Sequence, residues 1–197
     1  RVKFITSGDR IYTLALNSDT LSEMSPFAKT FFNSFQYKDT SFGLPFHSSK
    51  ADLFFQDLQG EDSLAKLYAL KSVESIHFEN QHLPQLIKLI ENYHHEEFDV
   101  ESKSALIRTM GELKHPSIEP FFKKVYMRSI DTAQYQMAVL IALARSQSKS
   151  GSSRIKEYLD YETPLVSNDE VESFIFELYD SLSLYSNIFP WLLDYTR

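Results

Sequence analysis

The sequence predicts a mainly α-helical protein in which about four helical hairpins stack as an αα-solenoid, preceded by a short β-hairpin and one helix. Three observations support this fold class. The 197 residues include only five glycines and seven prolines, fewer turn formers than a β-sandwich or barrel requires. Hydrophobic residues make up 43% of the chain, which is enough to fill a core. Apolar helical segments also recur about every 33 residues.

The first 17 residues predict two antiparallel strands. In RVKFITSGDRIYTLALN, apolar and polar side chains alternate on both sides of the turn-forming residues 7–9. A helix is expected next, because Ser25 can act as an N-cap and Pro26 suits the first helical position. Phenylalanines then recur at helical spacing from Phe27 to Phe35. We expect this helix to cover the hairpin, because an isolated hairpin is only marginally stable in water.

Residues 37–50, YKDTSFGLPFHSSK, contain turn formers without a clear period and predict a linker. We therefore divide the chain near residue 45, into a β-hairpin and helix at residues 1–45 and a HEAT-like helical repeat domain, justified below, at residues 46–197. The chain begins with Arg1 instead of Met, so we expect a processed protein or a fragment. Residues 1–45 are then either the end of a larger upstream domain or a cap on the helices.

Helices fill the rest of the chain in this prediction. They cover residues 50–59, 62–76, 82–94, 100–113, 117–129, 132–147, 152–160 and 168–185, followed by a short aromatic end at 188–195. Asp131 with Gln134, and likewise Ser167 with Glu170, have the spacing of a capping box. Asp99 is expected to cap the helix that begins at residue 100.

Pairing consecutive helices gives four units of similar length, at residues 48–77, 81–113, 116–147 and 151–185. The second helices SALIRTMGEL and MAVLIALARS superpose at an offset of 33 residues, which places Ala105 on Ala138. Gly60 and Gly151 are expected in the breaks between helices. Because one such unit cannot bury its apolar face alone, neighbouring units are expected to stack into a solenoid.

The junction ALIRTMGELKHPSIEPFFKKV resembles a HEAT-like repeat. Its apolar second helix ends in Gly111-Glu112-Leu113, a short turn with Pro116 follows, and the next first helix begins near Ile118. The resemblance covers residues 48–185 and implies a superhelix whose second helices line a concave binding face. The next junction, ALARSQSKSGSSRI, lacks the Pro and the Gly-x-Leu, so the repeat is degenerate. The alternative is an ordinary helical bundle with coincidental spacing.

The net charge of −7 disfavours general nucleic-acid binding, which depends on neutralising phosphates. Residues 99–160 nevertheless carry ten Lys and Arg against seven Asp and Glu. Proteins with HEAT-like folds include DNA-repair glycosylases, which hold a DNA duplex in the concave face. Lys123, Lys124 and Arg128, however, are expected on a first helix and therefore on the convex side. We expect no nucleic-acid partner.

The stretch ENYHHEEFD, residues 91–99, contains the strongest candidates for metal ligands, His94, His95, Glu96 and Glu97. Adjacent residues on a helix point about 100° apart, so no more than two of them would share an ion. A di-iron enzyme with HEAT-like repeats needs a His-Glu pair in several repeats, and this chain has one such pair, at residues 95–96. No nucleophile elbow or glycine-rich phosphate loop is present. We therefore predict no enzyme, no catalytic or metal-binding residues and no cofactor.

The longest apolar run, Met137 to Ala144, is far shorter than the roughly 20 residues that cross a bilayer, so we expect no membrane insertion. Near the C-terminus, the aromatic residues between Phe174 and Trp191 are too many for one helix face. Either the last segment folds back as a cap, or this edge contacts an upstream domain or a second copy of the chain.

We interpret the chain as a non-enzymatic protein-binding scaffold whose partner is a protein or peptide. Outward positions on the second helices predict the binding residues Lys103, Ser104, Arg108, Gln134, Arg145, Ser173 and Glu177. The second hypothesis is a purely structural module of a larger protein. GDRIYTL and FFNSF resemble the closing segment of small domains in bacterial envelope proteins, which implies the cell envelope or periplasm. A HEAT-like nucleic-acid or metal-dependent enzyme fragment is the third hypothesis.

Overall fold

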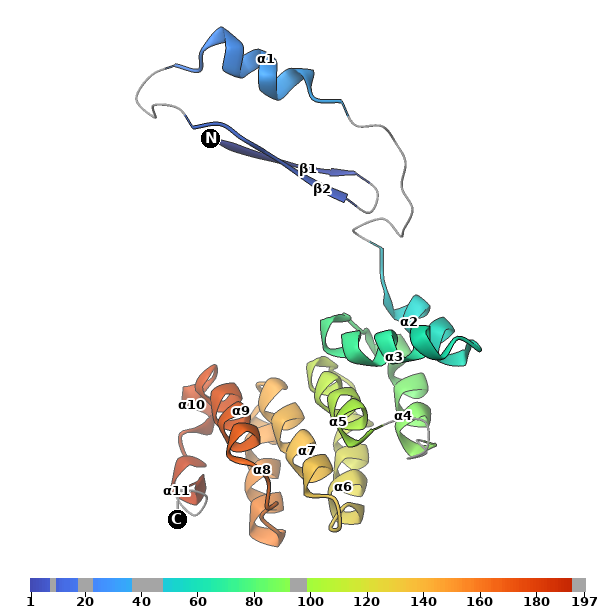
Figure 1. Cartoon of the computed structure of the whole chain (residues 1–197). Helices are drawn as coiled ribbons and strands as arrows, with labels where there is room; N and C mark the ends of the chain where they lie inside the picture. The colour runs from blue at the N-terminus through green and yellow to red at the C-terminus, as the bar shows by residue number, and fades with distance from the viewer. Residues whose placement is uncertain (8–9, 18–22, 37–47, 93–98, 193–197) are drawn as a thin grey trace. The chain divides into compact units, whose positions relative to one another are not determined.

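A computed structural model describes residues 1–7, 10–17, 23–36, 48–92 and 99–192, except for the side chain of Trp191. The described part is mainly helical and contains one small two-stranded antiparallel sheet (Figure 1). It divides into two compact units, Arg1–Ser49 and Lys50–Arg197. The predicted boundary near residue 45 and most of the predicted linker lie outside the described residues.

The first unit contains the predicted hairpin and helix. Strand β1 (Val2–Ser7) pairs antiparallel with β2 (Arg10–Ala15), with Phe4 opposite Thr13. Helix α1 (Pro26–Ser34) begins as predicted, because the Ser25 hydroxyl accepts a hydrogen bond from the backbone N–H of Ala28 at 3.2 Å. The residues predicted to form the tight turn lie partly outside the described part of the chain.

Within the described residues of the first unit, α1 partly covers one face of the hairpin, and apolar side chains of the other face are exposed. Tyr12 packs against Phe35, just after α1, with ring centroids 5.2 Å apart. On the opposite face Val2, Phe4 and Ile11 are exposed, Phe4 by 69%. The side chains of a strand alternate between its two faces, so a single helix covers only every second residue.

The described part of the second unit is built mainly of helices. Its first half contains α2 (Ala51–Gln59), α3 (Ser63–Ser72), the 3₁₀ turns η1 (Val73–Ser75) and η2 (Asn80–His82), and α4 (Leu83–Glu91). Its second half contains α5 (Val100–Thr109), η3 (Met110–Glu112), α6 (Ile118–Arg128), α7 (Ala133–Arg145), α8 (Lys149–Tyr161), α9 (Asn168–Tyr179), α10 (Leu182–Tyr185) and α11 (Phe189–Leu192). The predicted helix at 168–185 is thus divided into α9 and α10.

With the Ser25 cap of α1, three of the four predicted caps are confirmed. The Asp99 carboxylate accepts a hydrogen bond from the backbone N–H of Ser102 at 2.7 Å and so begins α5. Ser167 and Glu170 form the predicted capping box at the start of α9. The capping box predicted at Asp131 is wrong, because α7 begins two residues later than that residue and no side chain caps it.

Two glycines allow close approach to α7. A Cβ atom on Gly111 would lie 2.3 Å from the carbonyl oxygen of Ala142, and one on Gly151 would lie 2.8 Å from that of Leu143. The prediction that Gly151 lies in a break between helices is wrong. The Ser148 hydroxyl caps α8 by accepting a hydrogen bond from the Gly151 N–H at 2.9 Å, so the glycine lies in the first turn of the helix.

Helix α7 lies at the centre of the second unit. Figure 1 shows α5, α7 and α9 side by side, and α6 and α8 also pack against α7. Every residue from Tyr135 to Ala144 is buried, as the apolar character of this segment predicts. Among the described helices, none is long and apolar enough to cross a lipid bilayer.

The aromatic C-terminal segment is partly buried and partly exposed. Tyr185 is buried, and its hydroxyl donates to the carbonyl oxygens of Leu143 and Ala144 at 3.2 and 2.9 Å. Ile188 is also buried, so the segment after α9 packs back on the core. Phe176 nevertheless remains 74% exposed, which leaves an apolar face on α9.

Candidate binding groove

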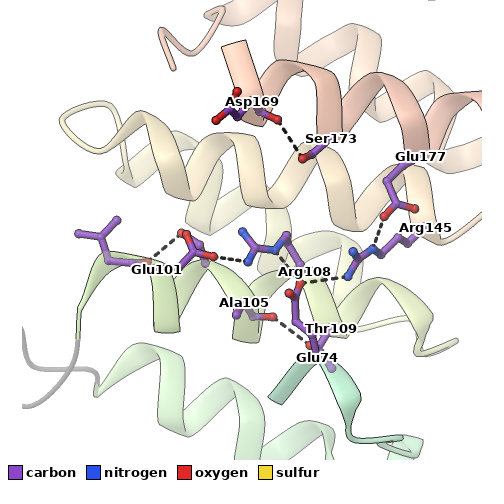
Figure 2. A network of polar contacts seen from close by, with 11 residues as sticks. Glu74, Glu101, Ala105, Arg108, Thr109, Arg145, Asp169, Ser173 and Glu177 are labelled. Atoms are coloured by element: carbon purple, nitrogen blue, oxygen red, sulfur yellow. Dashed lines mark hydrogen bonds and ion pairs between the residues drawn. The ribbon is translucent and has the colours of Figure 1, made fainter. Parts of the chain in front are cut away.

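A row of ion pairs crosses helices α5, α7 and α9 (Figure 2). Arg108 of α5 donates to Glu74 of η1 at 2.8 Å and to Glu101 at 2.5 Å. Arg145 of α7 donates to Glu177 of α9 at 2.7 Å and reaches Glu74 at 3.4 Å. Since Glu74 Oε1 accepts from both guanidinium groups, it joins the two halves of the row.

Helix geometry places these side chains on one surface. Glu101 and Arg108 are two helical turns apart, so they lie on the same face of α5. Arg108 and Arg145 each occupy the last turn of their helix, where a cation also interacts favourably with the helix dipole. The side-by-side packing of α5 and α7 then brings both arginines to Glu74 of η1.

The ion pairs stabilise the charged forms of their members. Burial alone would raise the pKa of Glu74, but hydrogen bonds and charge from Arg108 and Arg145 outweigh burial, and the pKa is lowered. Burial alone would lower the pKa of Arg108, but Glu74 and Glu101 outweigh it and the pKa is raised. The ion pairs therefore favour the charged forms of Glu74 and Arg108.

The row lies along a groove of about 240 Å³. This binding groove is lined by Glu74, Glu101, Arg108, Ile141, Arg145, Asp169, Glu170, Ser173 and Glu177. Five carboxylates thus face two guanidinium groups, and Ile141 supplies an apolar part of the wall. The Ser173 hydroxyl donates to the backbone carbonyl of Asp169 at 2.9 Å, and both of these side chains are exposed. The groove has an acidic surface with a small apolar area.

Four of the seven predicted binding residues line the binding groove. They are Arg108, Arg145, Ser173 and Glu177. Gln134 is exposed at the start of α7, and Lys103 lies outside the groove, with its ammonium group 4.7 Å from the ring centroid of Tyr135.

The expectation of an outward position for Ser104 is wrong. Its side chain is buried, with 1% of the residue exposed, and its hydroxyl donates to the Val100 carbonyl at 2.9 Å. Lys103 and Ser104 are adjacent, so their side chains leave the helix about 100° apart, and only one of them points outward.

Sequence reasoning missed the other five lining residues, Glu74, Glu101, Ile141, Asp169 and Glu170. Glu74 lies 34 residues before Arg108, and Glu177 lies 32 residues after Arg145, both close to one repeat length. A search for opposite charges at the offset of the repeat would have found these pairs. Asp169 has no such signal in the sequence, because only the packing of α9 beside α7 places it at the groove.

No metal centre emerges from the described residues. Among them, no group of three or more His, Asp or Glu side chains is arranged to hold a metal ion. The predicted ligand candidates at residues 94–97 lie outside the described residues. His82 is buried, and its Nδ1 accepts a hydrogen bond from the Glu79 backbone N–H at 2.9 Å, a structural role.

Comparison of the chain with protein-family models, with curated proteins and with solved structures finds no match. The resemblance of residues 48–185 to HEAT-like repeats therefore stays a prediction. The function is argued below from the geometry and charge of the binding groove.

Proposed function

We propose that the second unit is a short αα-solenoid of HEAT-like hairpins that binds a partner protein in the binding groove, without catalysis. Polar contacts at the repeat offset support the solenoid. Hydrogen bonds join Arg108 to Glu74, Lys123 to Glu157, and Arg145 to Glu177, at separations of 34, 34 and 32 residues. Equivalent positions of successive units thus contact one another, as stacked repeats require.

The order of packing also supports this arrangement. The second helices of successive units, α5, α7 and α9, pack against one another in chain order. The first helices α6 and α8 pack against α7, which is buried between its neighbours. This is the packing expected of stacked hairpins, in which the second helix of each unit contacts the second helices of the preceding and following units.

The main support for a binding function is the acidic groove that crosses the second helices α5, α7 and α9. Its two arginines are already paired with Glu74, Glu101 and Glu177, so these ion pairs orient the side chains of the groove before a partner binds. The carboxylates outnumber the arginines, and complementary charge guides the choice of partner. The expected partner is a protein segment that carries Lys or Arg next to a small apolar side chain.

Selection from a random peptide library tests this proposal. The second unit is expected to enrich peptides rich in Lys and Arg. A charge reversal in the groove, Asp169→Lys, should weaken the selected peptides on the order of tenfold, equivalent to about 1.4 kcal/mol. The matched control is Asp160→Lys, the same change at an exposed position of α8, outside the lining of the groove. Isothermal titration calorimetry measures both affinities.

Equal affinities of the two variants for the selected peptides would contradict the proposal, and so would enrichment of acidic peptides. Circular dichroism of each variant shows whether the helical fold is retained. If Asp169→Lys loses helicity as well as affinity, the loss of affinity is attributed to misfolding. Ser173→Lys, which also adds a positive charge to the groove, then replaces it as the test variant.

A structural module is the second candidate, because apolar side chains are exposed at both ends of the helical unit. Leu64 and Tyr68 are exposed on α3, and Phe176 and Tyr179 are exposed on α9. Such faces are typical of surfaces that contact another domain or a second copy. Sedimentation velocity distinguishes the candidates: self-association without peptide enrichment would favour the structural role over the groove.

A further inference from the structure

Helix α9 carries an exposed aromatic surface beside the binding groove. Phe176 is 74% exposed and Tyr179 is 59% exposed. Residues three or four positions apart are neighbours on the surface of a helix. Phe176 therefore adjoins Tyr179 and Asp180 towards the end of α9, and it adjoins Glu172 and Ser173 towards the start. All four neighbours are exposed. We call the surface of Glu172, Phe176, Tyr179 and Asp180 the α9 face.

The α9 face continues from one wall of the binding groove. Ser173, a neighbour of Phe176 on the helix, lines the groove, and so does Asp169, one turn before it (Figure 2). The groove itself offers little apolar surface, because Ile141 is only 4% exposed. Phe176 thus supplies, at the edge of the groove, the exposed apolar surface that its lining lacks.

The aromatic part of the α9 face is supported from behind. The ring of Tyr179 packs against that of Phe189 in α11, with ring centroids 5.5 Å apart. Phe189 is partly buried and packs against the core of the second unit. A ring that is already held in place loses little conformational freedom when a partner covers it. Exposed aromatic residues of this kind are enriched at protein interfaces.

The charge of this part of the chain indicates the kind of partner. Residues 161–192 contain six Asp and Glu and neither Lys nor Arg. Lys and Arg can pack their apolar stems on an aromatic ring while their charged ends face nearby carboxylates such as Glu172 and Asp180. A second copy of the same face would bring like charges together, which disfavours self-association. Charge complementarity therefore favours a partner that is basic as well as apolar.

We infer that the partner segment bound in the binding groove extends over α9 and places a large apolar side chain on Phe176 and Tyr179. Basic residues beside this side chain face Glu172 and Asp180. The inference rests on the proposed function, because it describes the same partner. Neighbouring positions on a helix surface are about 5 to 6 Å apart, which an extended segment spans in about two residues and a helical segment in about three or four. The partner should therefore carry an apolar residue about two to four positions from the Lys or Arg that lies beside Ser173.

Selection of a random peptide library on the whole chain tests this inference. The wild type should enrich peptides with Lys or Arg and an apolar residue at that spacing. Phe176→Ser should retain the enrichment of Lys and Arg and lose the apolar residue. It should also weaken the peptide selected on the wild type about tenfold in calorimetry. The control Tyr161→Ser should not, because this 55% exposed aromatic residue at the end of α8 lies outside the groove lining and the α9 face.

A double-mutant cycle tests the contact itself. Replacing the apolar residue of the peptide by serine should weaken binding to the wild type, with little further effect on the Phe176→Ser variant. If the wild type enriches no basic peptides, the proposed function fails and this inference fails with it.

Basic peptides that bind the wild type and Phe176→Ser equally would leave the groove proposal standing and overturn this inference alone. Sedimentation velocity gives the remaining outcome. Self-association of the wild type that Phe176→Ser abolishes, without a change in peptide affinity, would assign the α9 face to a second copy of the chain and also overturn the inference.

Discussion

Tyr126 and Tyr158 stack in the core between α6 and α8, with ring centroids 4.7 Å apart, but their hydroxyl groups differ in hydrogen bonding. The Tyr126 hydroxyl donates to the Glu162 carbonyl at 2.5 Å. The Tyr158 hydroxyl is buried with no hydrogen-bond partner among the described residues. Burial, followed by the charge of Glu157, raises the pKa of Tyr158 to about 12. A buried polar group without a partner lowers stability.

Replacing each tyrosine by phenylalanine should therefore give different changes in stability. Tyr126→Phe removes a hydrogen bond and should lower the free energy of unfolding by about 0.5 to 1.5 kcal/mol. Tyr158→Phe removes an unsatisfied hydroxyl and should leave stability unchanged or raise it. Urea denaturation followed by circular dichroism measures both, and each variant is the other's control. A loss above about 1 kcal/mol in Tyr158→Phe would mean that its hydroxyl has a partner.

Glu74 predicts a pH dependence of stability. Its pKa in the folded chain lies below the ordinary value of 4.5, so folding favours the charged carboxylate. The stabilisation is complete above the ordinary pKa and is lost as pH falls through the lower folded value. Glu74→Gln should therefore lower stability at pH 7, by less than about 1 kcal/mol because the side chain is 42% exposed and screened by water.

The difference between wild type and Glu74→Gln should shrink as pH falls through the lowered folded pKa of Glu74, because the wild-type carboxyl is then neutral as well. Thermal unfolding between pH 7 and pH 3 measures this. Glu172→Gln, the same chemical change at an exposed position of α9, is the control. A difference that stays constant over the whole pH range would contradict the role of charge at Glu74.

At the scale of the helices, the close approach of η3 to α7 depends on a missing side chain. A Cβ atom on Gly111 would meet the backbone of Ala142, with the oxygen at 2.3 Å and the carbonyl carbon at 2.8 Å. Backbone atoms cannot rotate away as the end of a flexible side chain does. An added methyl group would therefore push α5 with η3 away from α7, at the centre of the second unit.

Gly111→Ala should lower the free energy of unfolding by about 1 to 3 kcal/mol, the usual cost of overpacking. Gly60→Ala is the matched control, because its Cβ would lie 3.3 Å from the nearest atom, the Asp57 carbonyl oxygen, and the residue is exposed. That change should alter stability by no more than about 0.5 kcal/mol. Equal effects of the two substitutions would mean that η3 and α7 are not closely packed.

At the scale of the whole molecule, ion pairs neutralise much of the basic segment at residues 99–160. Lys123 pairs with Glu157 at 3.0 Å, Lys124 pairs with Glu91, and Arg154 lies 3.5 Å from Glu119. Arg108 and Arg145 are paired with glutamates along the binding groove. Cations that already face carboxylates have less to gain from a phosphate, and the net charge of −7 repels nucleic acids.

We therefore expect weak binding to random-sequence duplex DNA, with a dissociation constant above about 10⁻⁴ M at physiological salt. Fluorescence anisotropy of a labelled duplex measures the affinity. Micromolar binding that falls steeply between about 50 and 200 mM salt would contradict this expectation and favour a nucleic-acid-binding role.

The sequence by itself determined the local features of the chain. The hairpin, the helix caps at Asp99 and Ser167 and the mainly helical character depend on residues close together in sequence, so they were predictable. The burial of α7 was predictable for a related reason, because a helix that is apolar almost all round has no face suited to water. Gly151 was misplaced because a serine three residues earlier caps the helix, a local signal that a glycine-based rule ignores.

Only the tertiary structure decided which charges meet and which side chains face outward. Glu74 and Arg145 are 71 residues apart, and their contact depends on the packing of α5 against α7. Ser104 and Lys103 are neighbours in the chain, but Ser104 is buried and Lys103 is partly exposed. A shift of one residue turns a helical side chain by about 100°, so a small error in helix rotation reverses its exposure. To predict which charges pair across a groove, one must know both the rotation of each helix about its axis and the spacing between helices. Neither can be read from a single segment of the sequence.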